Sequence, residues 1–301
     1  RDWSSDVCSS DLLKKLCEEI FGAENFVGQV TWKARVKPVN IGEAKYRPQK
    51  EVEYVLMYQK SYVPRTFFPL FTGGERSYPH EIDGRKYRLT TILKSNRGAN
   101  FRSTMSFSLG DYSPPEGQRW QAGEDVIHQL NNDGYIEFRD GTPFRRYFED
   151  EEGAEHDPFY CFMEVDWSST SEAGKSQLNE ILGNQHGFDT VKPVRLIKTL
   201  IQACTSRQDN HLVMDFFGGS GTTAHAVMQL NSEDGGNREF MVVQVSEPSI
   251  TKSGIAKYET IAELCKERIR RSGAAVLASD THDGWGRDIG FRVLKIASSN
   301  M

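Results

Sequence analysis

The sequence predicts an α/β protein built on a parallel sheet, with a β-rich module inserted into it. Beyond residue 167, strand-like runs alternate with amphipathic helical segments, which is typical of parallel βαβ units. One such run, residues 211–217, leads directly into the turn Gly218-Gly219-Ser220-Gly221 and then into a further helical segment. Residues 61–166 differ, because Gly, Pro and Asn turns separate short strand-like pieces there.

The expected elements follow from local periodicity. Apolar residues at helical spacing from Leu12 to Ile20 predict a helix that Gly22 ends. Residues 26–32 and 51–60 are rich in β-branched and aromatic residues and predict two strands of one sheet, joined by a basic loop. In the module we expect strands at 86–93, 134–140 and 145–150, a helix at 122–130 and an exposed acidic loop at 149–157. After it we expect helices at 175–183, 192–205, 222–231 and 261–271, and strands at 211–217, 238–247 and 291–297.

The composition is that of a globular protein, with 38% hydrophobic and 11% aromatic residues in 301. No apolar run approaches the roughly 20 residues that a membrane helix requires. The cysteines are scattered without C-x-x-C pairs, which predicts a reducing cytoplasm and no metal site; they are Cys8, Cys17, Cys161, Cys204 and Cys265. Residues 1–12 lack the features of a secretory signal and look like a translated sequencing adapter, so we set them aside.

Charge is distributed unevenly along the chain. The formal net charge is −5, yet residues 31–102 contain 15 Lys and Arg against 6 Asp and Glu. This segment therefore carries +9 and the remainder −14. Such an asymmetry predicts a nucleic-acid-binding face, and a solvated basic surface is the alternative.

The glycine turn is the strongest candidate for a ligand site. Glycine permits positive φ and removes the Cβ that would hinder approach to the backbone at the carboxyl edge of a sheet. A phosphate-binding P-loop is excluded, because Thr222 and not Lys follows Gly221. The spacing from Gly219 to Ala224 does satisfy G-x-G-x-x-A, so a nicotinamide or flavin cofactor stays open.

Two acids favour a different ligand. Asp215 ends the strand before the turn, where a carboxylate repels a pyrophosphate but attracts an ammonium group such as that of S-adenosylmethionine (AdoMet). Glu247 ends the next expected strand, where it can accept hydrogen bonds from ribose hydroxyls. The alternative is that Asp215 caps the following turn and that Glu247 is an exposed strand end.

Four stretches carry a family resemblance: "DFFGGSGTTAHAVMQLN", "EDGGNREFMVVQVSE", "YETIAELCKERIRR" and "DIGFRVLKIASSN". They resemble the AdoMet-binding half of adenine-specific (N6) DNA methyltransferases, especially the modification (Mod) subunits of type III restriction-modification systems. The resemblance implies an incomplete Rossmann-like, class I AdoMet-dependent methyltransferase sheet with an inserted target-recognition module. It divides the chain into a partial catalytic subdomain (13–60), the recognition module (61–166), the AdoMet-binding subdomain (167–275) and the start of a C-terminal region (276–301).

The resemblance also implies roles for residues and partners. Glu247 would hold the ribose, and Lys192 and Pro193 would lie by the methionine moiety. Phe216 and Phe217 are either pocket walls or ordinary core residues. The residues expected to line the AdoMet pocket are Asp215, Phe216, Gly218, Gly219, Ser220, Gly221 and Thr222. Family members of this type act on double-stranded DNA, typically dimerise and join an ATP-dependent restriction nuclease.

The catalytic tetrapeptide of that family, D-P-P-Y, does not occur in these 301 residues. "SPPE" at 113–116 lacks the ring that stacks on a flipped adenine and predicts a turn, and "DPFY" at 157–160 lacks one proline. We therefore expect a truncated fragment that does not transfer methyl groups alone. An upstream S-P-P-Y would indicate cytosine-N4 methylation, so a cytosine or RNA amine methyltransferase and a non-catalytic dinucleotide-binding module stay as alternatives.

The basic segment is the expected DNA-binding region. Its cations alternate with aromatic residues, and cations neutralise phosphates. The residues expected to bind DNA are Lys33, Arg35, Lys37, Arg47, Arg97 and Arg102. Trp120 is expected to be a core residue of the module in preference to a base-stacking one.

Overall fold

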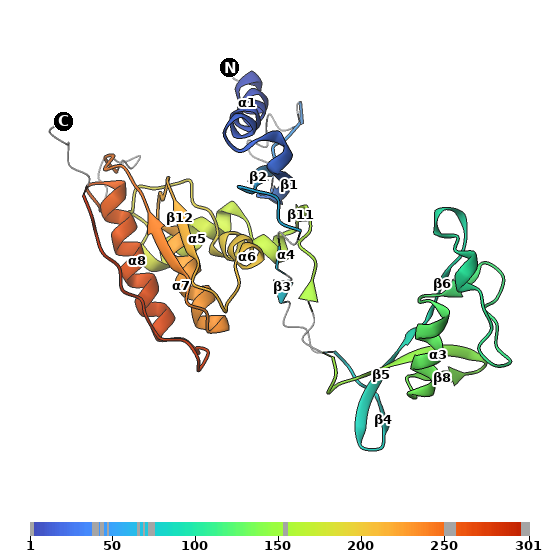
Figure 1. The fold of residues 1–301 in the computed structure, drawn as a ribbon. Coiled ribbons are helices and arrows are strands. Elements are labelled where there is room, and N and C mark those ends of the chain that lie inside the picture. The colour runs from blue at the N-terminus through green and yellow to red at the C-terminus, as the bar shows by residue number, and fades with distance from the viewer. Residues whose placement is uncertain are drawn as a thin grey trace. The chain divides into compact units, whose positions relative to one another are not determined.

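The computed structural model describes residues 3–37, 42, 45–46, 48–64, 67–68, 70–71, 76–152, 156–249 and 257–295. The chain forms two compact units: unit 1 is Arg1–Leu70 with Pro158–Met301, and unit 2 is Phe71–Asp157 (Figure 1). Both units combine helices with small sheets, so the protein is a mixed α/β protein. Within these described ranges, no helix has the length and apolar character needed to cross a bilayer.

The elements of unit 1 are α1 (Trp3–Phe21), η1 (Ala23–Asn25), β1 (Phe26–Lys33), β2 (Val52–Tyr58), β11 (Phe162–Met163), α4 (Val165–Ser168), α5 (Ser171–Leu182), α6 (Val194–Cys204), β12 (Leu212–Asp215), α7 (Thr222–Asp234), β13 (Glu239–Val242) and α8 (Ile261–Leu277). The elements of unit 2 are β4 (His80–Ile82), β5 (Arg85–Thr91), β6 (Leu93–Ser95), η2 (Gly98–Asn100), η3 (Ser103–Met105), β7 (Gln118–Trp120), α3 (Glu124–Asn132), β8 (Ile136–Arg139) and β9 (Thr142–Phe148). Short strands β3 (Leu70–Phe71) and β10 (His156–Asp157) pair with each other at the two ends of the unit 2 segment.

The first sheet of unit 1 has the strand order β11-β1-β2. β1 and β2 are antiparallel, as expected for two strands of one sheet, and Gly22 ends α1 with φ 88°. The helix begins at Trp3, upstream of the expected start at Leu12. Val30 and Trp32 alternate with partly exposed residues and are buried against Leu196 of α6, which follows from the two-residue period of a strand.

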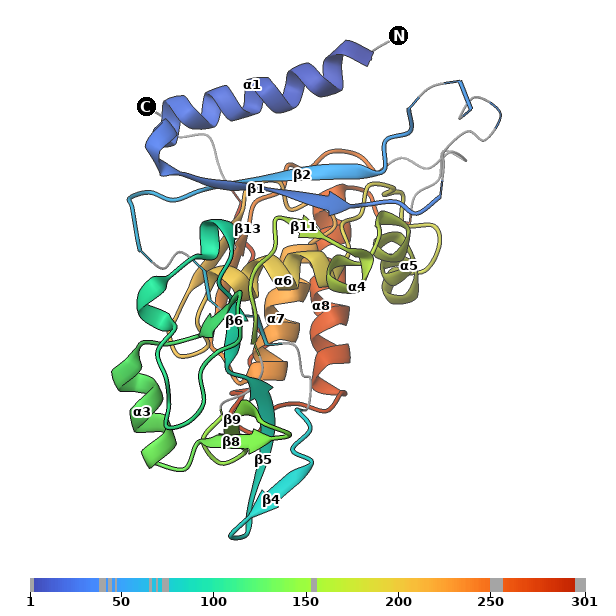
Figure 2. The same cartoon turned by 90° about the vertical axis from the view of Figure 1, so that its right-hand side faces the viewer.

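The second sheet of unit 1 is the pair β12-β13. The two strands are parallel, with Asp215 opposite Val242, and α7 connects them, so the expected βαβ unit is confirmed. Helix α7 lies between α6 and α8 (Figure 2), and its apolar side chains pack against Val213 of β12 and Phe240 of β13. Its buried face includes Ala226, Val227 and Leu230. The carboxyl ends of both strands therefore lie at one edge, beside the start of α7.

Two expectations about strands need correction. The described strands of unit 1 form two separate small sheets, because β12 and β13 are only four residues long and pair only with each other. The expected strand at 291–297 is wrong for its described residues, 291–295, which lie in no strand. Val293 and Leu294 are 57% and 89% exposed, and no neighbouring strand satisfies their backbone groups. Phe291 instead packs its ring against the α7–α8 cluster.

Unit 2 contains an antiparallel sheet of order β4-β5-β9-β8 and the two-stranded ribbon β6-β7. Two Asp-Gly turns with positive φ, at Asp83 and Asp140, connect β4 to β5 and β8 to β9, which is the preferred chemistry of a two-residue hairpin loop. Trp120 is fully buried, as expected for a core residue, and its Nε1 donates a 2.8 Å hydrogen bond to the carbonyl of Phe107.

Arginines of β5 bind carboxylates of the acidic run in unit 2. Glu152 accepts two 2.6 Å hydrogen bonds from the guanidinium of Arg88, and its side chain is 11% exposed. Asp150 accepts a pair of 2.9 Å hydrogen bonds from Arg85. The expectation of an exposed loop is confirmed for Glu149, Asp150 and Glu151, which are exposed turn residues. It is wrong for Glu152, which Arg88 binds, and for His156 and Asp157, which form β10.

Candidate AdoMet site

The glycine turn connects β12 to α7 through hydrogen bonds of its own backbone. Gly218 N donates to Val243 O at 3.0 Å, which joins the turn to the residue that follows β13. Gly221 N donates to Gly218 O at 2.7 Å, and Gly221 adopts a left-handed conformation, with φ 80°, as the N-cap of α7. Gly219 N donates to Oε1 of Gln244 at 2.7 Å. The turn is thus held by β13 and by the segment that follows it.

The carboxylate of Asp215 lies inside this turn. Its Oδ1 accepts a 3.0 Å hydrogen bond from Phe217 N, and its Oδ2 accepts a 2.6 Å hydrogen bond from the Thr223 hydroxyl in the first turn of α7. The capping role considered for Asp215 from the sequence is therefore present. A carboxylate oxygen can accept more than one hydrogen bond, so this role leaves acceptor capacity for a ligand.

The glycines of the turn are needed for internal packing. A Cβ on Gly218 would lie 2.1 Å from Cγ1 of Val242, and a Cβ on Gly221 would lie 3.0 Å from the sulfur of Cys265. A Cβ on Gly219 would lie 3.1 Å from the ring of Phe188. The absence of side chains thus allows the turn to sit against β13 and α8. An alanine at position 218 would require Val242 to move.

A buried arginine on α8 lies against the same turn. Arg268 is fully buried, and its Nη1 donates 2.7 Å hydrogen bonds to the hydroxyl oxygens of Ser220 and Thr222. Its Nε and Nη2 have no hydrogen-bond partner among the described residues. Burial lowers the pKa of Arg268 to about 10, so the group keeps its charge at neutral pH. The turn therefore rests on a buried positive charge.

The exposed rim of the turn has a different character. Phe216 and Phe217 are 62% and 92% exposed, so neither is a core residue, which excludes that alternative for both rings. Glu247 is exposed and its carboxylate has no partner among the described residues. The expectation that Glu247 ends a strand is wrong, because β13 ends at Val242 and Glu247 lies five residues further along the chain. The segments that follow the two strands contain two exposed rings and, among the described residues, an unpaired acid.

Lys192 and Pro193 lie where α6 begins. The Lys192 carbonyl accepts a 3.3 Å hydrogen bond from the Thr222 hydroxyl, so this segment is joined to the turn and, through Thr222, to Arg268. Pro193 is buried and is the N-cap of α6. The ammonium of Lys192 lies 2.5 Å from Oε2 of Glu53 on β2 and 5.2 Å from the ring centroid of Trp32 on β1.

A family model for DNA methylases matches residues 4–267, most of the chain. The chain belongs to the DNA methylase family. The type III restriction-modification enzyme StyLTI Mod subunit of Salmonella typhimurium is 29% identical over 95% of this chain and 43% of the relative. The EcoP15I Mod subunit of Escherichia coli is 26% identical over 94% and 48%, and the type II methyltransferase M.KpnI of Klebsiella pneumoniae is 28% identical over 81% and 61%.

These relatives confirm the resemblance to modification subunits of type III systems. The chain spans about half the length of the curated relatives that it matches. Membership of a DNA methylase family implies an AdoMet-type methyl donor and the fold of an AdoMet-dependent methyltransferase.

The residues expected to bind DNA are divided between the two units. In unit 1, Lys33 ends β1 and Arg35 and Lys37 are exposed, while Arg47 lies outside the described residues. In unit 2, Arg97 and Arg102 are both exposed. Arg102 Nη1 donates to the carbonyls of Ala99 and Phe101, so its guanidinium is held by its own loop, whereas the guanidinium of Arg97 forms no hydrogen bond or ion pair among the described residues. "SPPE" forms a turn, as expected, closed by a 2.9 Å hydrogen bond from Gln118 N to Pro115 O.

Sequence reasoning missed Arg268, Gln244 and Glu53. For Arg268 a signal was present: it lies four residues after Leu264 and four before Ser272, on the stripe of α8 that becomes buried. A charged residue on an apolar stripe indicates a buried interaction. For Gln244 and Glu53 the sequence contains no comparable signal, because their partners are distant in the chain.

Proposed function

We propose that this chain is the AdoMet-binding and DNA-contacting part of an adenine-N6 DNA methyltransferase, the modification subunit of a restriction-modification system. One observation carries the cofactor assignment: the segments that follow a parallel strand pair contain the exposed rings of Phe216 and Phe217 and, five residues beyond β13, the carboxylate of Glu247, which is unpaired among the described residues. The turn that follows β12 is supported by Asp215. Internal packing accounts for the glycines, but it does not account for these rings or for this acid. Large exposed rings grouped at a strand exit mark a binding surface.

The side chains fit AdoMet in chemical class. The carboxylate of Glu247 would accept hydrogen bonds from both ribose hydroxyls, and the two rings would pack on the adenine plane. Asp215 would face the ammonium group, which it attracts through its charge. When bound, AdoMet supplies the methyl group as an activated sulfonium substituent.

On the side of the methionine carboxylate, two cations are available. Lys192 is partly exposed and its ammonium has two further donors beside its Glu53 contact, so it can bind a carboxylate without losing that ion pair. Arg268 contributes positive potential from below the turn. Both residues thus favour a ligand that carries an anionic end, as AdoMet does.

Double-stranded DNA is the proposed substrate, bound through Lys33, Arg35, Lys37 and Arg47 of unit 1 and Arg97 and Arg102 of unit 2. The cations of unit 1 and Arg102 would neutralise phosphates and confer a strong dependence on salt. A homodimer and a restriction subunit with nuclease and ATPase activity are the proposed protein partners. The proposed compartment is the cytoplasm.

Isothermal titration of the purified chain with AdoMet and, separately, with NAD tests the cofactor assignment. We expect binding of AdoMet in the micromolar range, which corresponds to about 8 kcal/mol, and no binding of NAD. Binding of NAD without AdoMet would show that the turn holds a dinucleotide. To test the substrate, a gene product that includes a D-P-P-Y segment is incubated with DNA and AdoMet that carries a labelled methyl group. We expect the label on adenine. Label on cytosine would reject the proposed adenine-N6 methylation.

A further inference from the structure

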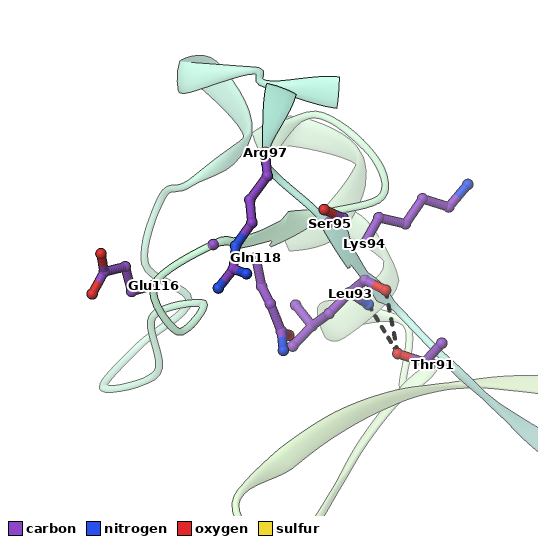
Figure 3. Close-up of a pocket in the computed structure, with 8 residues that line it drawn as sticks. Thr91, Leu93, Lys94, Ser95, Arg97, Glu116 and Gln118 are labelled. Carbon is purple, nitrogen blue, oxygen red and sulfur yellow. Dashed lines mark hydrogen bonds between the residues drawn. The ribbon is translucent and has the colours of Figure 1, made fainter. Parts of the chain in front are cut away.

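The ribbon β6-β7 of unit 2 ends in a polar hollow that the cofactor site does not explain. The hollow has a volume of about 410 Å³ and lies at the open end of the ribbon (Figure 3). Six of its eight lining residues have polar or charged side chains; the lining consists of Thr91, Leu93, Lys94, Ser95, Arg97, Glu116, Gly117 and Gln118. Small-molecule pockets are mostly apolar, so this lining suits a polar macromolecular surface better.

The strand register places the lining side chains on one face. Ser95 lies opposite Gln118, and Arg97 continues the first strand with an extended backbone, φ −124° and ψ 151°. Because side chains alternate along a strand, Ser95, Arg97 and Gln118 share one face of the ribbon, while Lys94 belongs to the other. Figure 3 agrees, since Arg97 and Gln118 lie close together and Lys94 extends away from them.

The position of Arg97 is set by the turn opposite to it. A Cβ on Gly117 would lie 2.4 Å from Nε and 2.7 Å from Nη2 of Arg97, so the guanidinium rests directly on the main chain of this glycine. The turn itself is closed on the ribbon by a 2.9 Å hydrogen bond from Asn96 N to Gly117 O. Arg97 therefore has a defined place without forming an ion pair among the described residues.

Most other arginines of unit 2 already form ion pairs with carboxylates of the same unit. Arg85 and Arg88 bind the acidic run, and Arg139 and Arg146 both bind Glu137. The guanidinium of Arg97 is different, because it faces a hollow in which the one carboxylate, that of Glu116, forms no ion pair with it.

The side chains of Arg97, Glu116 and Gln118 match the hydrogen-bonding groups of base edges better than they match phosphates. Arginine pairs with guanine O6 and N7, glutamine with adenine N6 and N7, and glutamate accepts from cytosine N4 in the major groove. A site for phosphate alone would not include the carboxylate of Glu116. A two-stranded β-ribbon also fits the width of the major groove.

We propose that the end of the β6-β7 ribbon reads base edges in the major groove of duplex DNA, with Arg97 and Gln118 as the residues that determine specificity. This inference rests on the proposed function, since it requires DNA as the substrate. Arg97 recognises one base pair and Gln118 another. Gly117 is a positioning residue, because it lets the guanidinium lie against the backbone.

The experiment uses the full chain and a library of 30-base-pair duplexes with ten randomised central positions, selected by binding and sequenced. We expect the wild-type chain to enrich a motif. Arg97→Ala and Gln118→Ala are each expected to lose preference at one position, reducing discrimination there roughly 5- to 150-fold, which corresponds to one bidentate base contact. Gly117→Ala keeps the charge and is expected to relax the same position as Arg97→Ala.

Lys94→Ala is the matched control, because Lys94 borders the same hollow but its side chain extends away from Arg97 and Gln118 (Figure 3). It is expected to weaken binding to all duplexes equally and to reduce the slope of log Kd against log salt concentration by about 1. If Arg97→Ala behaves in this way too, Arg97 contacts phosphate and the inference is overturned. An unchanged motif in both Arg97→Ala and Gln118→Ala, or no motif in the wild type, overturns it as well.

AdoMet binding by the same proteins separates this inference from the proposed function. A chain that binds AdoMet but shows no change of motif in the variants keeps the proposed function and loses the inference. A chain that binds neither AdoMet nor DNA loses both.

Discussion

Arg268 of α8 donates a 2.7 Å hydrogen bond to the hydroxyl of Thr222, the first residue of α7. The same nitrogen donates to Ser220, and Thr222 in turn donates to the carbonyl of Lys192. One buried guanidinium therefore joins α8, the glycine turn and the start of α6. The family resemblance assigns the glycine turn and the start of α6 to the cofactor, and it assigns no role to α8.

Replacing Arg268 should lower the affinity for AdoMet while changing the stability of the fold only a little. Arg268→Met removes two hydrogen bonds to a charged group, which destabilises the fold by about 1.5–3 kcal/mol each. It also removes the cost of burying a charge that has no ion-pair partner, which stabilises the fold. We expect a net change in the free energy of unfolding within about 2 kcal/mol and a fall in AdoMet affinity of at least about fivefold, because the turn is less constrained. Arg268→Lys should restore part of the affinity. Equal affinity in all three proteins would show that Arg268 has no effect on the cofactor site.

Gly221→Ala should destabilise unit 1. The residue has φ 80°, and an added Cβ would lie 3.0 Å from the sulfur and 3.3 Å from the carbonyl oxygen of Cys265. Left-handed strain and the contact with backbone together predict a loss of about 2–3 kcal/mol, measured by urea unfolding. Gly286→Ala is the control, because a Cβ there meets nothing within 4 Å, and it should change stability by less than about 0.5 kcal/mol. A loss of the same size at both positions would contradict the packing argument.

Glu247→Ala should weaken AdoMet binding without affecting the fold. Two hydrogen bonds to the carboxylate would be lost, which predicts a fall in affinity of about 10- to 100-fold. The melting temperature should not change, because the side chain is exposed and makes no ion pair among the described residues. Glu239→Ala on β13 is the matched control and should bind AdoMet normally. Unchanged titration curves for Glu247→Ala would remove this residue from the site.

Stability should fall in mild acid because of His225. Burial, and then the charges of Arg268 and Lys198, lower the pKa of His225 to about 3. Below its usual pKa near 6.5 the unfolded chain takes up a proton that the folded chain does not, so stability rises with pH and is lost as pH falls from about 6.5 towards 3. We expect a slope of about 1 kcal/mol per pH unit between pH 6 and 5. His225→Leu should show a smaller slope, and identical slopes would indicate that another group dominates.

Charge reversal at Arg97 and Arg102 together should weaken DNA binding by the chain and leave AdoMet binding unchanged. Both residues lie in unit 2, away in sequence from the residues assigned to the cofactor. Fluorescence anisotropy with a labelled duplex and titration with AdoMet measure the two affinities on the same protein. Equal loss of both would reject the DNA-binding assignment.

Much of the local structure could be predicted from the sequence. Gly22 ends α1, the alternation in residues 26–33 gives β1, and the Asp-Gly turns at 83–84 and 140–141 close hairpins, because each depends on backbone preferences of a few adjacent residues. The parallel pairing of β12 and β13 follows from the helical period of the segment between them. The strand expected at 291–297 was wrong for its described part, since a strand also needs a partner that local pattern does not specify.

For the cofactor site, the sequence by itself determined which residue types surround the turn: glycines that permit positive φ, an acid before them and an acid after the next strand. Only the tertiary structure decided what each one contacts. It directs the glycines towards Val242, Phe188 and Cys265, leaves Phe216 and Phe217 exposed and brings Arg268 beneath the turn. The physical reason is that backbone conformation is a property of adjacent residues, whereas burial and hydrogen bonding depend on segments brought together from 24 to 48 positions apart in the chain.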